Sequence, residues 1–169
     1  MWDHRGQARP HFAEEPGPGQ ESAWDYPRPP VAEACPRLVE VKDGDTLLAR
    51  TTASYRVKET ASPPTFYLPP EDVRVDLLVP VPGSSICEWK GAASYFALAR
   101  NPSAPVAWTY SQPRPRFERI RNYYAFYPGG IACYVDGERV EPQPGRFYGG
   151  WITRDVGGPF KGEPGTCHW

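Results

Sequence analysis

Apolar and polar residues alternate with a period of two along most of the chain between residues 37 and 140, a pattern typical of β-strands with one buried face. Arg37–Lys42 alternates clearly, and Asp43-Gly44 predicts a hairpin turn into a second strand at Thr46–Ala49. A second hairpin turn is predicted at Asp136-Gly137. The remaining predicted strands are residues 54–58, 65–68, 73–77, 106–110, 131–135 and 138–140.

Glycine and proline punctuate this pattern. Residues 86–99 hold Gly91, which predicts either two strands or one strand bent at the glycine. A helix longer than one turn is predicted only from Pro115, with apolar side chains on one face over about two turns. The sequence therefore predicts a mostly β fold of about eight short strands with one short helix.

The two ends of the chain lack this alternation. Residues 1–36 hold scattered apolar side chains among prolines and charges, and residues 147–169 are rich in aromatic residues and glycine. We expect an N-terminal Pro-rich arm over residues 1–36, a β core domain over residues 37–146, and a C-terminal arm over residues 147–169 packed on the core. A length of 169 residues fits one compact domain.

Composition and charge exclude several classes of protein. The chain has 22 prolines and 16 glycines, too many for a helical bundle. Its formal net charge is −1, so it lacks the basic surface that binds duplex nucleic acid or an anionic membrane. No stretch resembles a membrane span or a secretory signal. We therefore expect a cytoplasmic protein with no nucleic-acid partner and no membrane partner.

The cysteines and histidines offer little metal or triad chemistry. Cys35, Cys87, Cys133 and Cys167 include no C-x-x-C pair, so reduced thiols are expected rather than a structural zinc site. All three histidines lie in the terminal segments, so a histidine-dependent triad would need a terminus folded across the core. The sequence predicts no metal site and no cofactor.

Two acidic clusters have simple structural explanations. Glu71 and Asp72 follow Pro70, where acidic residues favour the start of a helical turn. Asp43-Gly44-Asp45 imitates the D-x-D motif of metal-dependent transferases, but the same letters form a hairpin turn.

Cys87 and Lys90 are the candidate reactive pair. A cation near a thiol lowers the pKa of the thiol and makes it a better nucleophile. On a regular strand the two side chains face opposite sides, so they meet only if the chain bulges before Gly91. The alternatives are a buried, inert Cys87 and a Lys90 that either contacts an anionic ligand or is simply exposed.

Aromatic residues are more numerous than a core of this size needs, with six tryptophans and ten tyrosines. Those on or beside predicted strands are candidates to wall a pocket: Tyr67, Trp89, Tyr95, Trp108, Tyr110 and Trp151. With Arg74, Lys90 or Arg56 at its rim, such a pocket would accept a planar, partly anionic small molecule. The same rings could instead pack the core and pin the arms.

Several motifs resemble the domain of unknown function 427 family. The matching runs are Tyr67–Arg74, Cys87–Tyr95, Ala107–Tyr110 and Ala125–Tyr127, in the order and spacing of that family. The resemblance covers about residues 38–140, and the flanks resemble a longer subgroup. It implies a compact, mostly β domain similar to the Mss4-like or β-tent folds, which bind small ligands in aromatic pockets, without their zinc cysteines here.

The family is also catalogued under a nucleotidyltransferase label. Such an enzyme needs converging carboxylates and a phosphate-cradling loop, and the sequence offers only a helical turn and a hairpin turn. The family's motif residues, carried over by position, are Tyr67, Glu71, Asp72, Arg74, Cys87, Trp89, Lys90, Gly91, Tyr95, Trp108 and Tyr110.

The sequence thus predicts a small β protein that binds a planar or anionic small molecule in an aromatic pocket. The expected ligand-binding residues are Tyr67, Arg74, Trp89, Tyr95, Trp108 and Tyr110, with Lys90 adding charge. One alternative is an enzyme that uses Cys87 as nucleophile or redox thiol, assisted by Lys90 or Glu88. Another is a structural or partner-binding protein whose arms exchange in a homodimer.

Overall fold

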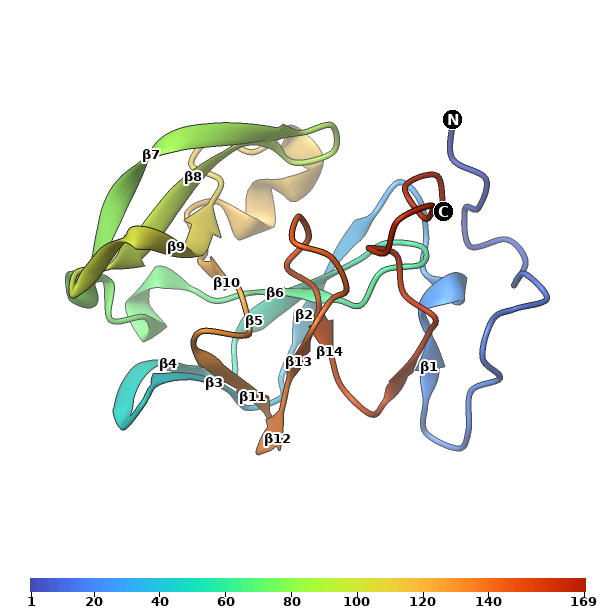
Figure 1. The fold of residues 1–169 in the computed structure, drawn as a ribbon, viewed down its shortest axis with the longest axis horizontal. Coiled ribbons are helices and arrows are strands. Elements are labelled where there is room, and N and C mark those ends of the chain that lie inside the picture. The colour runs from blue at the N-terminus through green and yellow to red at the C-terminus, as the bar shows by residue number, and fades with distance from the viewer.

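The computed structural model describes residues 1–169 and is mostly β, as the sequence predicts (Figure 1). It contains fifteen strands, nine of them with three or more residues, and four short 3-10 helices. The strands are β1 (Glu21–Ser22), β2 (Val31–Cys35), β3 (Val39–Asp43), β4 (Thr46–Thr51), β5 (Ser54–Lys58), β6 (Thr65–Tyr67), β7 (Leu78–Cys87), β8 (Gly91–Leu98), β9 (Asn101–Thr109), β10 (Ala125–Phe126), β11 (Ala132–Val135), β12 (Glu138–Arg139), β13 (Glu141–Pro142), β14 (Trp151–Ile152) and β15 (Val156–Gly157). The helices are η1 (Ala23–Asp25), η2 (Pro70–Asp72), η3 (Val75–Leu77) and η4 (Pro115–Ile120).

Three open sheets form the body of the molecule. Their strand orders are β10-β9-β8-β7, β12-β11-β3-β4 and β2-β5-β6. All their neighbouring strands are antiparallel, which suits the short turns that connect them. In Figure 1 the sheet of β7, β8 and β9 lies at one end and that of β3, β4 and β11 along one edge. The likeness to Mss4-like and β-tent topologies stays a prediction.

The main core lies against the sheet of β3 and β11. Val39 and Val41 of β3 stand opposite Val135 and Cys133 of β11, and all four side chains are fully buried. This burial confirms the alternation seen in the sequence, because residues two apart on a strand share a face. A second apolar cluster joins Val57 of β5 with aromatic residues of β6 and β9 and with η4.

The predicted hairpins are confirmed. β3 and β4 join at the Asp43 turn, and β11 and β12 join at Asp136-Gly137. Residues 86–99 form two strands, because Cys87 closes β7 opposite Gly91 at the start of β8. The one-strand alternative is therefore wrong.

One predicted strand is wrong. Residues 73–77 do not run as a strand: Val73 makes a single bridge to Ala49 and the chain then turns into η3. Arg74 and Asp76, the polar residues of the apparent alternation, form an exposed ion pair over the turn. The predicted short helix is present as η4, a 3-10 helix of six residues that is kinked at Phe117.

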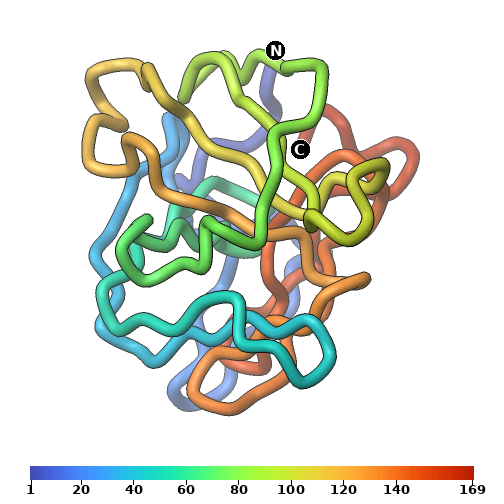
Figure 2. The backbone as a smooth tube through the Cα atoms, turned by 90° about the vertical axis from the view of Figure 1, so that its left-hand side faces the viewer, coloured from blue at the N-terminus to red at the C-terminus, as the bar shows by residue number.

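The terminal segments meet each other on one side of the body (Figures 1 and 2). β1 pairs in parallel with β15, and the Asp3 N–H donates to the His168 carbonyl at 3.0 Å. Residues 31–35, within the range that the sequence assigns to the arm, form strand β2 beside β5. No helix of the structure has the length and apolar character needed to cross a membrane.

Candidate functional site

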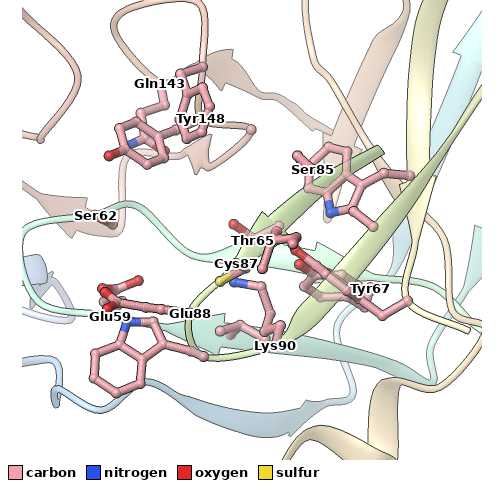
Figure 3. A pocket seen from close by; sticks show the side chains of 18 of the residues that line it. Glu59, Ser62, Thr65, Tyr67, Ser85, Cys87, Glu88, Lys90, Gln143 and Tyr148 are labelled. Carbon is pink, nitrogen blue, oxygen red and sulfur yellow. The ribbon is translucent and has the colours of Figure 1, made fainter. Parts of the chain in front are cut away.

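A cavity of about 350 Å³ opens beside the β7–β8 hairpin. Its walls come from β5 to β9, from the loop after β13 and from both terminal segments. The lining residues are Trp2, Val57, Glu59, Ser62, Pro63, Thr65, Tyr67, Ser85, Ile86, Cys87, Glu88, Trp89, Lys90, Ala93, Tyr95, Trp108, Tyr110, Tyr127, Gln143, Phe147, Tyr148, Gly149 and Lys161. Figure 3 shows Cys87 and Lys90 between Tyr67 on one side and Glu59 and Glu88 on the other.

The sheet register explains the aromatic wall. Tyr95 of β8 stands opposite Trp108 of β9, so both rings lie on one face of the sheet. The Trp108 ring lies 6.3 Å from the Tyr67 ring, edge to face, and 4.4 Å from the Tyr127 ring. The five predicted ligand-binding aromatic residues therefore line one cavity.

Burial keeps the phenols of this wall neutral. It raises the pKa of Tyr67 and Tyr110 far above the ordinary value of a phenol, and also that of Tyr127. The Tyr95 hydroxyl lies 2.5 Å from the Ser85 hydroxyl. The rings thus offer flat apolar faces with hydroxyl groups that donate and accept, which suits a planar ligand.

Cys87 and Lys90 line the same cavity because the chain reverses between them. Residues 88–90 form the turn that joins β7 to β8, with Gly91 at a φ of +109°. The sequence predicted that the two side chains meet only if the strand bulges before Gly91. A hairpin turn brings them to the same cavity without such a bulge, so the prediction was too narrow. The Lys90 Nζ lies 5.9 Å from the centre of the Tyr110 ring and forms no ion pair.

The two predicted arginines lie outside the cavity, which corrects their placement. Arg74 is exposed and pairs with Asp76 at 2.8 Å, because the turn at η3 directs it to solvent. Arg56 of β5 pairs with Glu33 on the neighbouring strand β2 and with Glu21 of β1. Neither side chain is free to meet a ligand in the cavity.

Lys161 supplies the second cation, which the sequence analysis missed. Its exposed fraction is 3%, and its Nζ lies 3.7 Å from the centre of the Trp2 ring and 5.4 Å from that of Tyr148. The Nζ has no hydrogen-bond or ion-pair partner. Burial, followed by the charge of Arg28, lowers the pKa of its ammonium group. The only sequence signal was a lone lysine in an aromatic, glycine-rich segment.

The N-terminal segment closes the wall beside Lys161. Arg28 lies 4.3 Å over the Trp2 ring and pairs with Glu59 at 3.1 Å. The negative charge of Glu59 is thereby compensated by Arg28, while Glu88 on the exposed turn has no ion-pair partner. The uncompensated charges of the cavity are therefore the Lys90 and Lys161 ammonium groups and the Glu88 carboxylate.

Trp89 leaves a buried hydrogen-bond donor unused. The Nε1 of its indole ring is buried without an acceptor, and the residue lines the cavity. Buried indole N–H groups normally have a partner, so an acceptor on a ligand would complete it. Trp24 has a similar orphan N–H, but it lies outside the cavity.

The four cysteines are free thiols in different surroundings. Cys35 and Cys133 are buried, Cys87 is partly buried and Cys167 is exposed. Burial raises the pKa of Cys133 to about 12, so that thiol stays protonated. No three His, Cys, Asp or Glu side chains come together to hold a metal ion.

Comparison with known proteins gives a family without an assigned activity. The family model NTP_transf_9, described as a domain of unknown function (DUF427), matches residues 31–141. No curated protein matches the chain. The matched region holds most of the cavity wall, whereas Trp2, the 147–149 loop and Lys161 come from the flanking segments.

Proposed function

The chain belongs to the DUF427 family of domains of unknown function, as its motifs suggested, and we propose that its cavity reversibly binds a small planar molecule that carries an anionic group. The observation that carries this proposal is the pair of lysines without ion pairs, Lys90 and Lys161, in a cavity walled by aromatic rings. An anion on the ligand supplies the missing partner for both ammonium groups. A planar ring stacks on the aromatic wall.

The size and polarity of the cavity support the same ligand class. About 350 Å³ lies within the range of small-molecule sites, which combine apolar walls with a few polar groups. The orphan Trp89 N–H adds one donor for an acceptor atom of the ligand. A long or branched ligand would conflict with the rings that already pack against Trp108, with Tyr67 edge to face and Tyr127 tilted.

A thermal-shift screen with planar aromatic carboxylates and phosphates tests the proposal. A ligand at a hundred times its Kd stabilises the native state by roughly 2.7 kcal/mol, which raises the Tm by roughly 5–10 °C for a chain of this size. We expect the shift of any hit to shrink in Lys90→Ala and to persist in Cys87→Ala. Lys42→Ala is the control, because Lys42 lies over the Tyr134 ring, outside the cavity.

A full shift in Lys90→Ala, or no shift with any compound of the screen, contradicts the proposal. Binding elsewhere on the surface would be insensitive to Lys90→Ala.

Thiol chemistry at Cys87 is the second candidate function. It is favoured by the position of Cys87 beside Lys90 in one cavity, where a cation stabilises a thiolate. Alkylation rates of the native protein distinguish the two functions. If Cys87 reacts faster than the exposed Cys167, the result supports thiol chemistry. If Cys87 reacts more slowly than Cys167, thiol chemistry is excluded as the function.

A further inference from the structure

The cations that line the cavity are lysines, although arginine is the more abundant basic residue in the chain. The chain has four lysines among its 19 basic residues, and two of the four, Lys90 and Lys161, line the cavity. No arginine lines it. Arginine is the better residue for fixed, bidentate recognition of an anion, whereas lysine is the basic side chain that loses its proton readily when buried. This choice points to an amine with a chemical role beyond its charge.

Lys161 has the surroundings of a reactive amine. Its side chain is 3% exposed, aromatic rings surround it, and no carboxylate pairs with it. The Arg28 guanidinium lies over the same Trp2 ring, so a second cation is close by. Burial, followed by the charge of Arg28, lowers the pKa of the amine, although Glu59, Cys167 and Glu88 act in the opposite direction.

The backbone on both sides of Lys161 is fixed. Its N–H donates to the Ala61 carbonyl at 2.8 Å, and its carbonyl accepts from Gln143 Nε2 at 2.8 Å. The neighbouring Gly162 has no Cβ, which lets that backbone approach the Pro144 carbonyl closely. The amine is therefore presented to the cavity from a rigid support, as a site for chemistry requires.

We propose that the Lys161 Nζ forms an imine with a small planar aldehyde or ketone that also carries an acidic group, and that this carbonyl compound is the ligand class of the cavity. The inference rests on the proposed function, since it adds a covalent bond to the same ligand. Lys90 contacts the acidic group, and the aromatic wall stacks on the planar part.

The reaction balances without an oxidant or reductant. The lone pair of the neutral amine attacks the carbonyl carbon, and the carbonyl π electrons move to oxygen. A proton passes from nitrogen to that oxygen to give a carbinolamine, which then loses water and leaves a C=N bond. Glu88, on the cavity wall without an ion pair, is a group that can carry the proton. The protonated imine keeps its charge against the Trp2 and Tyr148 rings.

Borohydride trapping tests the inference on the full chain. The probe is pyridoxal 5′-phosphate, a planar aromatic aldehyde with an anionic group, and borohydride reduces any imine to a stable amine. Peptide mass spectrometry then locates the label. We expect Lys161 to carry several-fold more label than Lys42 and Lys58, because Lys161 lines the cavity and the other two lysines do not. Label on the Met1 amine is counted separately.

Pyridoxine 5′-phosphate, which has an alcohol in place of the aldehyde, provides the matched control. It should compete with labelling of Lys161 and should still raise the Tm of Lys161→Arg, which keeps the charge but cannot form an imine. Lys90→Ala should leave Lys161 as the labelled residue but require more probe. Lys161→Met is a second variant that cannot form an imine, for use if Lys161→Arg does not fold. The labelling pattern of the wild-type protein tests the inference without any variant.

Label spread evenly over the four lysines, or concentrated on Lys90, overturns the inference. A rise in Tm with pyridoxine 5′-phosphate and no trapped adduct at Lys161 overturns the imine and leaves reversible binding intact. A third outcome separates the two proposals. If Lys161 is labelled selectively, pyridoxine 5′-phosphate does not compete and no anionic compound raises the Tm, the result supports the reactive amine and counts against the anion site.

Discussion

Arg28 links four separate segments of the chain through one side chain. Its guanidinium donates to the carbonyls of His4, Thr60 and Trp169 and to the Glu59 carboxylate, at 2.8 to 3.1 Å. The Arg28 side chain is completely buried, so its guanidinium depends on these four acceptors instead of water. A single residue thereby joins both termini to the segment after β5.

We expect Arg28→Ala to lower the free energy of unfolding by about 3–5 kcal/mol, the usual cost of removing one partner of a buried ion pair. The loss arises because Glu59 and three carbonyls are left without a donor. Arg74→Ala removes an arginine whose ion pair is exposed, and should leave stability unchanged. Urea unfolding of both variants measures the difference. Equal stability of the two would show that the Arg28 contacts contribute nothing.

The sequence identifies about a third of the residues that line the cavity, and which ones it identifies depends on how close they lie along the chain or across paired strands. Cys87, Trp89 and Lys90 lie within one turn, and Tyr95 and Trp108 lie on paired strands, so their meeting depends on hairpin geometry. Lys161 and Trp2 are brought to the cavity from opposite ends of the chain. Only tertiary closure places them, and no local pattern encodes it. The prediction that Arg74 lies at the cavity was wrong for the opposite reason, because a local 3-10 turn takes the place of the expected strand.

At the scale of the element, the β7–β8 hairpin brings Cys87, Trp89 and Lys90 to the cavity. Its first half was missed from the sequence because Pro80, Pro82 and Gly83 interrupt the apolar pattern. β7 is an edge strand, where proline costs no hydrogen bond on the open side, and Gly83 falls within its bulge between Val81 and Ser84. By contrast, the Asp-Gly turns of the other hairpins carry a local signal that sequence analysis can read.

Gly91 holds the end of this hairpin in a conformation that other residues resist. Its φ of +109° is strained for any residue with a Cβ, and an added Cβ would lie 3.4 Å from the Gln112 carbonyl oxygen. We expect Gly91→Ala to destabilise the protein by about 1–3 kcal/mol and to displace Lys90, the preceding residue. Chemical denaturation measures the first effect, and weaker binding of any ligand found in the thermal-shift screen measures the second.

Gly130→Ala is the matched control, since Gly130 has no positive φ and no atom within 4 Å of its added Cβ. It should lose no stability. A Gly91→Ala protein as stable as Gly130→Ala would mean that the hairpin tolerates a side chain at this turn and that the glycine does not position Lys90.

At the scale of the whole molecule, the terminal segments complete the cavity. The Phe12 ring stacks on Trp169 with 5.1 Å between centres, and both rings contact the buried Trp24. Trp2 and Lys161 then form the wall that the core alone lacks. If the termini were displaced, the cavity would open to water and Lys161 would regain its hydration, so the chemistry proposed for its amine depends on this closure.

The path of the chain between arm and core argues for closure within one molecule. Only residues 23–30 separate β1 from β2, and within them Trp24, Tyr26 and Arg28 are buried on the body of the same chain. Exchange of the N-terminal arm with a second copy would have to release these three side chains or rebuild every contact between chains. Intramolecular contacts also benefit from an effective concentration on the order of millimolar, which a partner at micromolar concentration cannot match.

We therefore expect sedimentation equilibrium at micromolar protein to give a single species of 18.9 kDa, the mass of one chain. Deletion of residues 1–12 should leave that mass close to a monomer and lower the Tm, because Arg28 loses its contact with Trp2 and Trp169 loses its contact with Phe12. Twice the monomer mass for the full chain, reduced to one chain by the deletion, would establish an arm-exchanged homodimer. In that case the Trp2 that faces Lys161 in each cavity would belong to the other copy, and mixing Trp2→Ala chains with Lys161→Arg chains would restore one complete cavity per heterodimer.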